Sequence, residues 1–225
     1  ETGVGKEVLA ERLHHKSPRK DKAFLRLNCA ALSESLFESE LFGHERGAFT
    51  GAVGTKQGLL ETANGGTAFL DEVGELTPTM QVKLLRVIER REVLRVGGLK
   101  STQIDVRFVS ATHRDLPEEV KAGRFRADLY FRLNGISLTV PPLRERRDEI
   151  LKLAREFATE TCKLSHLPDV ELARDTLAAL ERFDWPGNIR ELRNVMERAV
   201  LLSTDGVVLP IHLGLEEPSI DGADD

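Results

Sequence analysis

The chain has 225 residues, of which 40% are hydrophobic and 31% are charged, and its formal net charge is −5. This length allows one large domain or two modest ones, and the composition is ordinary for a globular protein. No 18-residue window is apolar throughout, so the sequence predicts no membrane span. It shows no signal-peptide pattern either, and we expect a cytoplasmic location. The acidic balance disfavours a broad nucleic-acid surface. Cys29 and Cys162 lack metal-ligand spacing and favour a reducing compartment.

The first seven residues contain most of a phosphate-binding loop of the form G-x-x-x-x-G-K-[ST], namely Glu1-Thr2-Gly3-Val4-Gly5-Lys6-Glu7. Glycines in such a loop let backbone N–H groups surround a phosphate, and the following helix presents its positive end there. The chain starts inside the motif, which suggests a fragment of a longer protein. Glu7 stands where the motif usually has the hydroxyl of a Ser or Thr. The alternative is that the glycines only cap the helix predicted over 8–13.

A strand is predicted over 24–28, ending on the amide of Asn28, and a helix over 33–41 with Ser33 as its N-cap. A glycine-punctuated loop follows over 42–54, and Phe49 is one aromatic residue among its small ones. Because a bare phenylalanine is costly unless a partner covers it, this loop is a candidate binding segment. The alternative is a hairpin that tucks Phe49 into the protein's own core.

The apolar run over 67–70 predicts a buried parallel strand, and it ends on two adjacent acids, Asp71 and Glu72. In doubly wound sheets ligands sit beyond the carboxyl ends of strands, and successive side chains point to opposite sides. One acid could therefore hold a hydrated metal ion while the other polarises a water molecule. The alternative is a strand that exits to solvent and carries charges for solubility.

Helical spacing predicts helices over 79–91 and 125–133, and β-prone runs predict strands over 92–96, 104–112 and 136–140. His113 follows the hydroxyl residues that end the second of these strands, and a lone histidine is usually a solvated or hydrogen-bonded side chain. Asp128 and Arg132 are four residues apart on a predicted helix, so a surface ion pair is the simplest role for Arg132.

After residue 142 the pattern is helical only, with helices predicted over 147–161, 171–182 and 188–202. Asn188 is the expected N-cap of the last of them. Arg190 then lies in the first turn, where a cation opposes the helix dipole, and this suggests a nearby anion. We therefore expect an α/β domain over 1–142, a small helical domain over 143–213 and an acidic tail or linker over 214–225.

These features occur in the order typical of a P-loop AAA+ ATPase, which has a three-layer α/β architecture with a parallel sheet and a small C-terminal helical lid. The segment Gly47-Ala48-Phe49-Thr50-Gly51-Ala52 resembles the GAFTGA loop of sigma-54-dependent transcriptional activators, the NtrC-like bacterial enhancer-binding proteins. Further stretches similar to that family lie at 41–45, 125–129, 142–146 and 185–192. The resemblance covers nearly the whole chain.

The resemblance implies ATP and Mg²⁺ as cofactors. Residues 1–7 would hold the nucleotide, with Lys6 at the β and γ phosphates. Asp71 would organise Mg²⁺, and Glu72 would polarise the attacking water. Asn28 resembles the family's switch residue, which can hold Glu72 away from that water. Glu7 is usual in this family, and its acid would contact magnesium through water.

The remaining roles also follow from the resemblance. Thr112 falls at the sensor-one position, where His113 comes next in place of a common asparagine. Arg126 and Arg132 resemble arginine fingers supplied in trans to a neighbour's nucleotide. Arg190 resembles the sensor-two arginine of the lid, which reaches the phosphates from its own chain.

The implied mechanism places ATP between subunits of a hexameric or heptameric ring. The loop around Phe49 and Thr50 would grip the sigma-54 factor and remodel the closed promoter complex, and the turn at 95–98 would support it as a second pore loop. Promoter or enhancer DNA would be bound through a domain absent from this chain, since no helix pair after Leu202 could read a major groove. The alternatives are an AAA+ motor of another class, such as an unfoldase or chelatase subunit, and a non-catalytic nucleotide-gated scaffold.

Overall fold

The computed structural model describes residues 1–31 and 33–215. The chain divides into two compact units, one of them Lys6–Leu138 and the other Glu1–Gly5 together with the residues from Thr139 onward. The domain boundary expected at 142/143 lies a few residues beyond this division, and residues 1–5 group with the helical unit. The predicted acidic tail lies outside the described residues from position 216 onward.

A three-stranded parallel sheet forms the centre of the Lys6–Leu138 unit, in the order β1 (Phe24–Asn28), β4 (Thr67–Asp71) and β7 (Arg107–Ser110). The predicted strands over 24–28 and 67–70 are confirmed. The third strand is shorter than the predicted 104–112, because the residues just before Ile104 pair with another strand and the Ile104 N–H donates to the carbonyl of Arg91.

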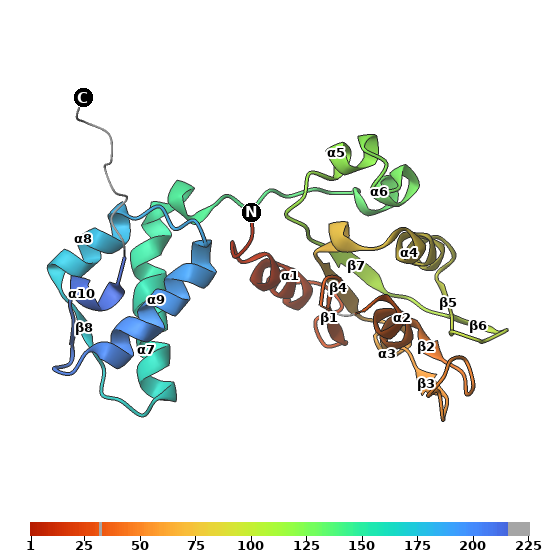
Figure 1. Ribbon diagram of the computed structural model, residues 1–225, viewed down its shortest axis with the longest axis horizontal. Coiled ribbons are helices and arrows are strands. Elements are labelled where there is room, and N and C mark those ends of the chain that lie inside the picture. The colour runs from red at the N-terminus through yellow and green to blue at the C-terminus, as the bar shows by residue number, and fades with distance from the viewer. Residues whose placement is uncertain (32, 216–225) are drawn as a thin grey trace. The chain divides into compact units, whose positions relative to one another are not determined.

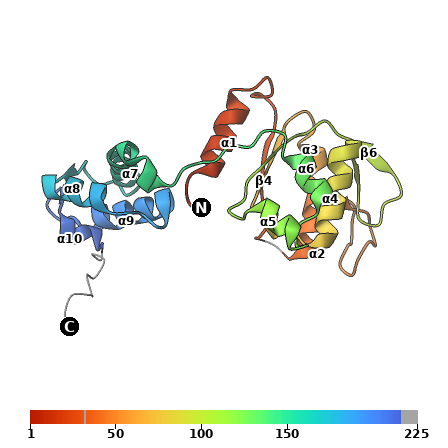
Figure 2. The ribbon, with the colours of Figure 1, turned by 90° about the horizontal axis from the view of Figure 1, so that it is seen from above.

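Helices cover both faces of this sheet. α1 (Lys6–His15) lies on one face, and the other carries α2 (Glu34–Phe42), α3 (Leu59–Thr62), α4 (Pro78–Arg90) and α6 (Ala127–Leu133) (Figures 1 and 2). The short elements η1 (Val73–Glu75) and α5 (Leu116–Lys121) complete the helical part of this unit. The expected three-layer α/β arrangement is therefore present.

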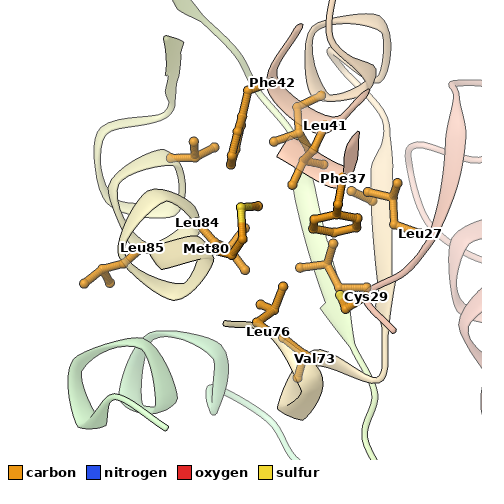
Figure 3. Packing of buried hydrophobic residues seen from close by; sticks show 14 of the residues in the cluster. Leu27, Cys29, Phe37, Leu41, Phe42, Val73, Leu76, Met80, Leu84 and Leu85 are labelled. Carbon is orange, nitrogen blue, oxygen red and sulfur yellow. The ribbon is translucent and has the colours of Figure 1, made fainter. Parts of the chain in front are cut away.

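The side chains of β4 alternate between these two layers, as the pleat of a strand requires. Ala68 and Leu70 belong to the main hydrophobic core, which packs the sheet against α2 and α4 (Figure 3). Thr67 faces the opposite layer, where its hydroxyl lies 3.0 Å from Nδ1 of the buried His14 of α1. Phe69 stacks on Phe24 with ring centroids 6.5 Å apart. By the same alternation, Asp71 emerges on the α1 side.

Two antiparallel hairpins extend from this unit, β2 (Gly43–His44) with β3 (Lys56–Gln57), and β5 (Glu92–Leu94) with β6 (Ser101–Gln103). The segment predicted as a strand over 136–140 forms none, so that prediction is wrong. Ile136 and Leu138 are 89% and 65% exposed. A β-prone sequence becomes a strand only when another strand satisfies its backbone groups, and none within the described residues does so here.

The second unit is built on α7 (Ile150–Leu164), α8 (Arg174–Arg182) and α9 (Asn188–Leu202), joined by η2 (Leu143–Glu145), η3 (Arg147–Glu149) and α10 (Pro210–Leu213). Trp185 is fully buried in its core, and its indole N–H donates to the Leu180 carbonyl at 2.9 Å. The helical-only prediction is wrong in one respect. β8 (Glu171–Leu172) pairs in parallel with β9 (Val207–Val208), so the helix predicted from residue 171 starts three residues later.

Asn188 is not the N-cap of α9, contrary to the prediction, because Gly187 takes that position. Asn188 has a left-handed backbone, with φ of 55°, and is fully buried. Its side-chain oxygen accepts from the Leu143 N–H at 2.8 Å, and its Nδ2 donates to the Thr2 carbonyl at 3.0 Å. Asn188 therefore joins three separate segments of this unit instead of closing one helix end.

A bidentate ion pair anchors the β5–β6 hairpin. Arg95 donates from Nε and Nη2 to the two carboxylate oxygens of Glu61, at 2.8 and 2.9 Å, and from Nη1 to Glu45 at 3.0 Å. The Glu61 side chain is only 4% exposed. Hydrogen bonds from Arg95 lower the pKa of Glu61 below its ordinary value of 4.5, although burial opposes this.

We predict that Arg95→Met lowers the free energy of unfolding by roughly 3 kcal/mol near neutral pH, because it leaves a buried carboxylate unpaired. The stabilisation from Glu61 is fully present above its ordinary pKa of 4.5 and is lost as the pH falls through the lowered folded-state value. The deficit of the variant should therefore shrink at acidic pH in urea denaturation. Arg90→Met is the control, since its pair with Glu92 leaves Arg90 70% exposed. A deficit that does not depend on pH would contradict the assignment.

Candidate functional site

The carboxyl end of β4 is tied to both neighbouring strands by main-chain hydrogen bonds. The Cys29 N–H donates to the carbonyl of Asp71, and the Ala111 N–H donates to the carbonyl of Leu70, both at 2.9 Å. Just beyond the strand, the Val73 N–H donates to the Ala111 carbonyl at 2.9 Å. These bonds bring the ends of all three strands together, so the residues that follow β1 and β7 lie beside the paired acids.

Asp71 carries a buried oxygen, Oδ1, for which the described residues offer no hydrogen-bond donor. Burial and the neighbouring charge of Glu72 raise the pKa of Asp71, although the Lys6 charge opposes this. A buried acceptor without a donor is costly, and a cation would relieve that cost. Burial and the same two carboxylates raise the pKa of the Cys29 thiol to about 12.

No group of three or more His, Cys, Asp or Glu side chains within the described residues could hold a metal ion. Mg²⁺ commonly binds through one or two carboxylates together with phosphate and water oxygens. The single unpartnered oxygen of Asp71 fits such an ion when a phosphate ligand brings it, and does not fit a metal site made by protein ligands alone.

Glu72 has a left-handed backbone with φ of 53°, which is uncommon for a residue with a side chain. Its Oε1 lies 3.5 Å from Nζ of Lys6 at the start of α1. Its Oε2 accepts from the His113 N–H at 3.1 Å and lies 2.7 Å from Nδ1 of His113. Burial raises the pKa of Glu72, but the hydrogen bonds from His113 and the Lys6 charge outweigh it and lower the pKa overall.

The expected contact between Asn28 and Glu72 is not among the hydrogen bonds of the described residues. The Asn28 side-chain oxygen instead accepts from the Ala30 N–H at 2.9 Å. The Thr112 hydroxyl accepts from the Arg114 N–H at 3.1 Å. Sequence reasoning left His113 out of the site. Two signals were available for it, its position directly after a predicted strand end and its place beside the sensor-one residue, where the resembling family commonly has an asparagine.

Residues 1–5 are held by the helical unit through their own backbone. The Gly3 carbonyl accepts from the Ile189 N–H at 3.0 Å, and the Val4 carbonyl accepts from Nη2 of Arg146 at 2.6 Å. Gly3 has φ of 72°, and a Cβ there would lie 2.5 Å from the Gly187 carbonyl oxygen. Only glycine fits this position.

The charged residues at this end of the chain have defined surroundings. Glu1 pairs with Arg144, whose hydrogen bonds lower the Glu1 pKa to about 2. Glu7 accepts from Nη1 of Arg26 at 2.8 Å. Arg190 lies exposed in the first turn of α9, with its Cβ 3.3 Å from where a Cβ of Gly3 would stand.

The two predicted arginine fingers lie on or beside α6. Arg126 pairs with Asp128, donating from Nη2 at 2.7 Å, and this bond raises the Arg126 pKa. The alternative role of Arg132, a surface ion pair with Asp128, is therefore wrong, because Asp128 pairs with Arg126 instead. Arg132 is exposed and forms no ion pair with another described residue.

The loop over 47–52 closes on itself between β2 and β3. The Gly47 N–H donates to the Ala52 carbonyl at 2.9 Å, and the Ala52 N–H donates to the Phe49 carbonyl at 3.0 Å. Phe49 is 46% exposed, and its ring meets the His44 ring edge-on at 5.0 Å. Phe49 therefore stays out of the hydrophobic core, contrary to the alternative of a hairpin that buries it.

The turn after β5 supports the base of this loop. The Val96 carbonyl accepts from the Glu45 N–H at 3.0 Å, and the Val96 N–H donates to the Gly43 carbonyl at 2.9 Å. At Gly97 a Cβ would approach the Ala48 Cβ to 2.8 Å. The two segments are therefore in direct contact.

Comparison with known proteins relates this arrangement to described families. The family described as "Sigma-54 interaction domain" matches residues 1–139, and the family described as "AAA+ ATPase lid domain" matches residues 144–218. The chain is 48% identical over 217 residues to the Nif-specific regulatory protein of Herbaspirillum seropedicae, covering 96% of this chain and 40% of that protein. It is 52% identical over 204 residues to the transcriptional regulatory protein ZraR of Klebsiella oxytoca, covering 91% and 46%.

Among solved structures, NtrX from Brucella abortus in complex with ATP matches with a TM-score of 0.84 and 35% identity, covering 94% of this chain and 49% of that one. With the parallel sheet and the helical unit, this likeness confirms the expected P-loop AAA+ fold with a C-terminal lid. The chain spans less than half the length of each of these relatives.

Proposed function

Because the chain belongs to the sigma-54 interaction domain family and continues into an AAA+ ATPase lid domain, we propose that it is the ATP-hydrolysing part of a bacterial transcription activator. Its substrate is ATP, and its target is the closed complex of sigma-54 RNA polymerase. The observation that carries the proposal is the pair Asp71 and Glu72 at the end of β4, in two chemically different environments.

In this proposal residues 1–7 bind the phosphates, Lys6 neutralises part of their charge, and Arg190 contributes a second cation. Asp71 holds Mg²⁺ through its unpartnered oxygen, and the ion shields phosphate charge during transfer. Glu72 polarises the attacking water. Its lowered pKa supports this role, because a general base must be ionised at working pH. Asn28 and Thr112 remain proposed as nucleotide-state sensors at the ends of β1 and β7.

We further propose that copies of the chain assemble into a ring in which Arg126 and Arg132 reach the nucleotide of a neighbour. Exposed guanidinium groups can stabilise the charge that spreads over a phosphoryl group in the transition state. Arg132 is exposed and forms no pair within the described residues, which supports this role. Arg126 first has to leave Asp128.

The loop over 47–52 is the proposed contact with the sigma-54 factor, with Phe49 as its apolar anchor and Thr50 beside it. The half-exposed ring of Phe49 and the support from the turn at 95–98 favour this assignment.

In this proposal, promoter or enhancer DNA is bound by a domain outside the present chain. Action on RNA polymerase implies a cytoplasmic location, and the free, buried Cys29 and Cys162 are compatible with one. No helix in the described part of the chain is both long and apolar enough to span a membrane.

Two other functions compete with this one. An AAA+ motor of another class would not need the loop over 47–52. A pull-down with the sigma-54 factor distinguishes the two functions, because only the proposed one requires binding. A nucleotide-gated scaffold would bind ATP without releasing phosphate. The environments of Asp71 and Glu72 argue against a scaffold, because a site that only binds has no use for an ionised base held beside a metal ligand.

We predict that Glu72→Gln lowers the kcat of ATP hydrolysis by about 10² to 10⁴, because the side chain keeps its size but loses its basicity. ATP affinity should be retained. A phosphate-release assay on the full-length protein measures kcat, and equilibrium binding measures the affinity for ATP. Glu89→Gln, at an exposed position of α4, is the matched control and should hydrolyse normally. Hydrolysis by Glu72→Gln at the wild-type rate would refute the assignment of the base.

We also predict that Phe49→Ala abolishes binding to the sigma-54 factor while ATP hydrolysis continues, because the ring is an exposed anchor outside the core. Val53→Ala is the control, since Val53 is 84% exposed just beyond the same loop. The measurement is co-purification with the sigma factor in the presence of a transition-state analogue of ATP hydrolysis. Retained binding by Phe49→Ala would remove the loop from the proposed interface.

A further inference from the structure

We propose that His113 is the positioning residue of the hydrolytic site. It holds Oε2 of Glu72 with two hydrogen bonds, so that Oε1 stays directed toward the Lys6 side, where it can accept from the attacking water. This inference rests on the proposed ATPase function. It assigns to His113 the control of the Glu72 carboxylate that resemblance alone assigns to Asn28.

The hydrogen bonds at Glu72 give the first support for this role. The main-chain N–H of His113 lies 3.1 Å from Oε2, and Nδ1 of the same residue lies 2.7 Å from it. An ionised carboxylate has no hydrogen to give, so Nδ1 must carry the hydrogen of this bond. Two donors on one oxygen fix the orientation of the carboxylate. Within the described residues they leave Oε1 with only the 3.5 Å contact to Nζ of Lys6.

The backbone at the end of β4 gives the second support for this role of His113. A left-handed conformation at Glu72 is unfavourable for a residue with a Cβ, and it persists only where the surroundings impose it. They do so here, because the Val73 N–H donates to Ala111 and a Cβ at Gly74 would lie 2.8 Å from the Thr112 hydroxyl. The segment 111–113 is thus packed closely against 72–74, and His113 has a fixed place beside Glu72.

The third support is that Asn28, the residue expected to act on Glu72, makes no hydrogen bond to it within the described residues. The Asn28 side-chain oxygen accepts from the Ala30 N–H instead. A solvated side chain does not account for the short bond of His113 to a carboxylate that is only 15% exposed. A histidine that is hydrogen-bonded without a role in hydrolysis is the remaining alternative, and the test below separates it from the proposal. His113 itself is 40% exposed, so substitution there should leave the fold intact.

The test compares three substitutions in the full-length protein by their kcat and KM for ATP. In asparagine the amide nitrogen can occupy the position of imidazole Nδ1, whereas in glutamine it corresponds to Nε2. We expect His113→Ala and His113→Gln to lower kcat about tenfold with KM unchanged, the scale of one hydrogen bond to a charged group. His113→Asn should keep most of the wild-type kcat. Thermal unfolding of each variant verifies that it is folded.

Each other result overturns the inference in a recognisable way. Equal losses in all three variants would mean that donation from the Nδ1 position is not what matters, and unchanged rates would mean that Glu72 needs no support. A higher kcat in His113→Ala would show that His113 restrains the base instead of directing it. If the wild-type protein releases no phosphate, the proposed function itself fails. If the wild type is active and the Asn–Gln difference is missing, only this inference fails.

Discussion

The arrangement of the candidate site depends on the main-chain hydrogen bonds at the carboxyl end of β4. Main-chain hydrogen bonds with Cys29, the residue after β1, and with Ala111, the residue after β7, hold that end in place. The two adjacent acids there have opposite environments. Asp71 has a buried oxygen that no described residue satisfies, and its pKa is raised. Glu72 is held by His113 and Lys6, and its pKa is lowered. In the proposed function the first environment suits a metal ligand and the second an ionised base, two roles that the bare dipeptide does not distinguish.

The loop over 47–52, the proposed contact with the sigma-54 factor, is likewise an exposed segment supported by hydrogen bonds and an ion pair at its base. Arg95 binds the nearly buried Glu61 with both ends of its guanidinium and also reaches Glu45. Val96 continues the connection through its own backbone to the segment that carries Phe49. The half-exposed ring of Phe49 thus lies on a hydrogen-bonded segment outside the core. In the proposed function this connection would transmit a change in the sheet to the partner.

Much of this arrangement could be predicted from short-range pattern, and the exceptions have physical causes. The apolar runs of β1 and β4 and the spacing of α4 and α9 were sufficient to place those elements. The strand expected over 136–140 failed because a strand also needs a neighbour, which its own sequence does not report. Asn188 has the chemistry of a cap, but it bonds to Leu143 and Thr2, which are distant in sequence. The contact between His113 and Glu72 depends on the register of β4 with β7, and no local pattern encodes that register.

The most direct test of the two roles at the end of β4 is a structure of the full-length protein with Mg²⁺ and a non-hydrolysable ATP analogue. We expect the ion to contact the Asp71 carboxylate, and a water beside the terminal phosphate to lie within hydrogen-bond distance of Glu72. His113 should still hold Oε2 of Glu72. A nucleotide bound away from the end of β4, or an Asp71 oxygen still without a partner in the complex, would contradict these roles.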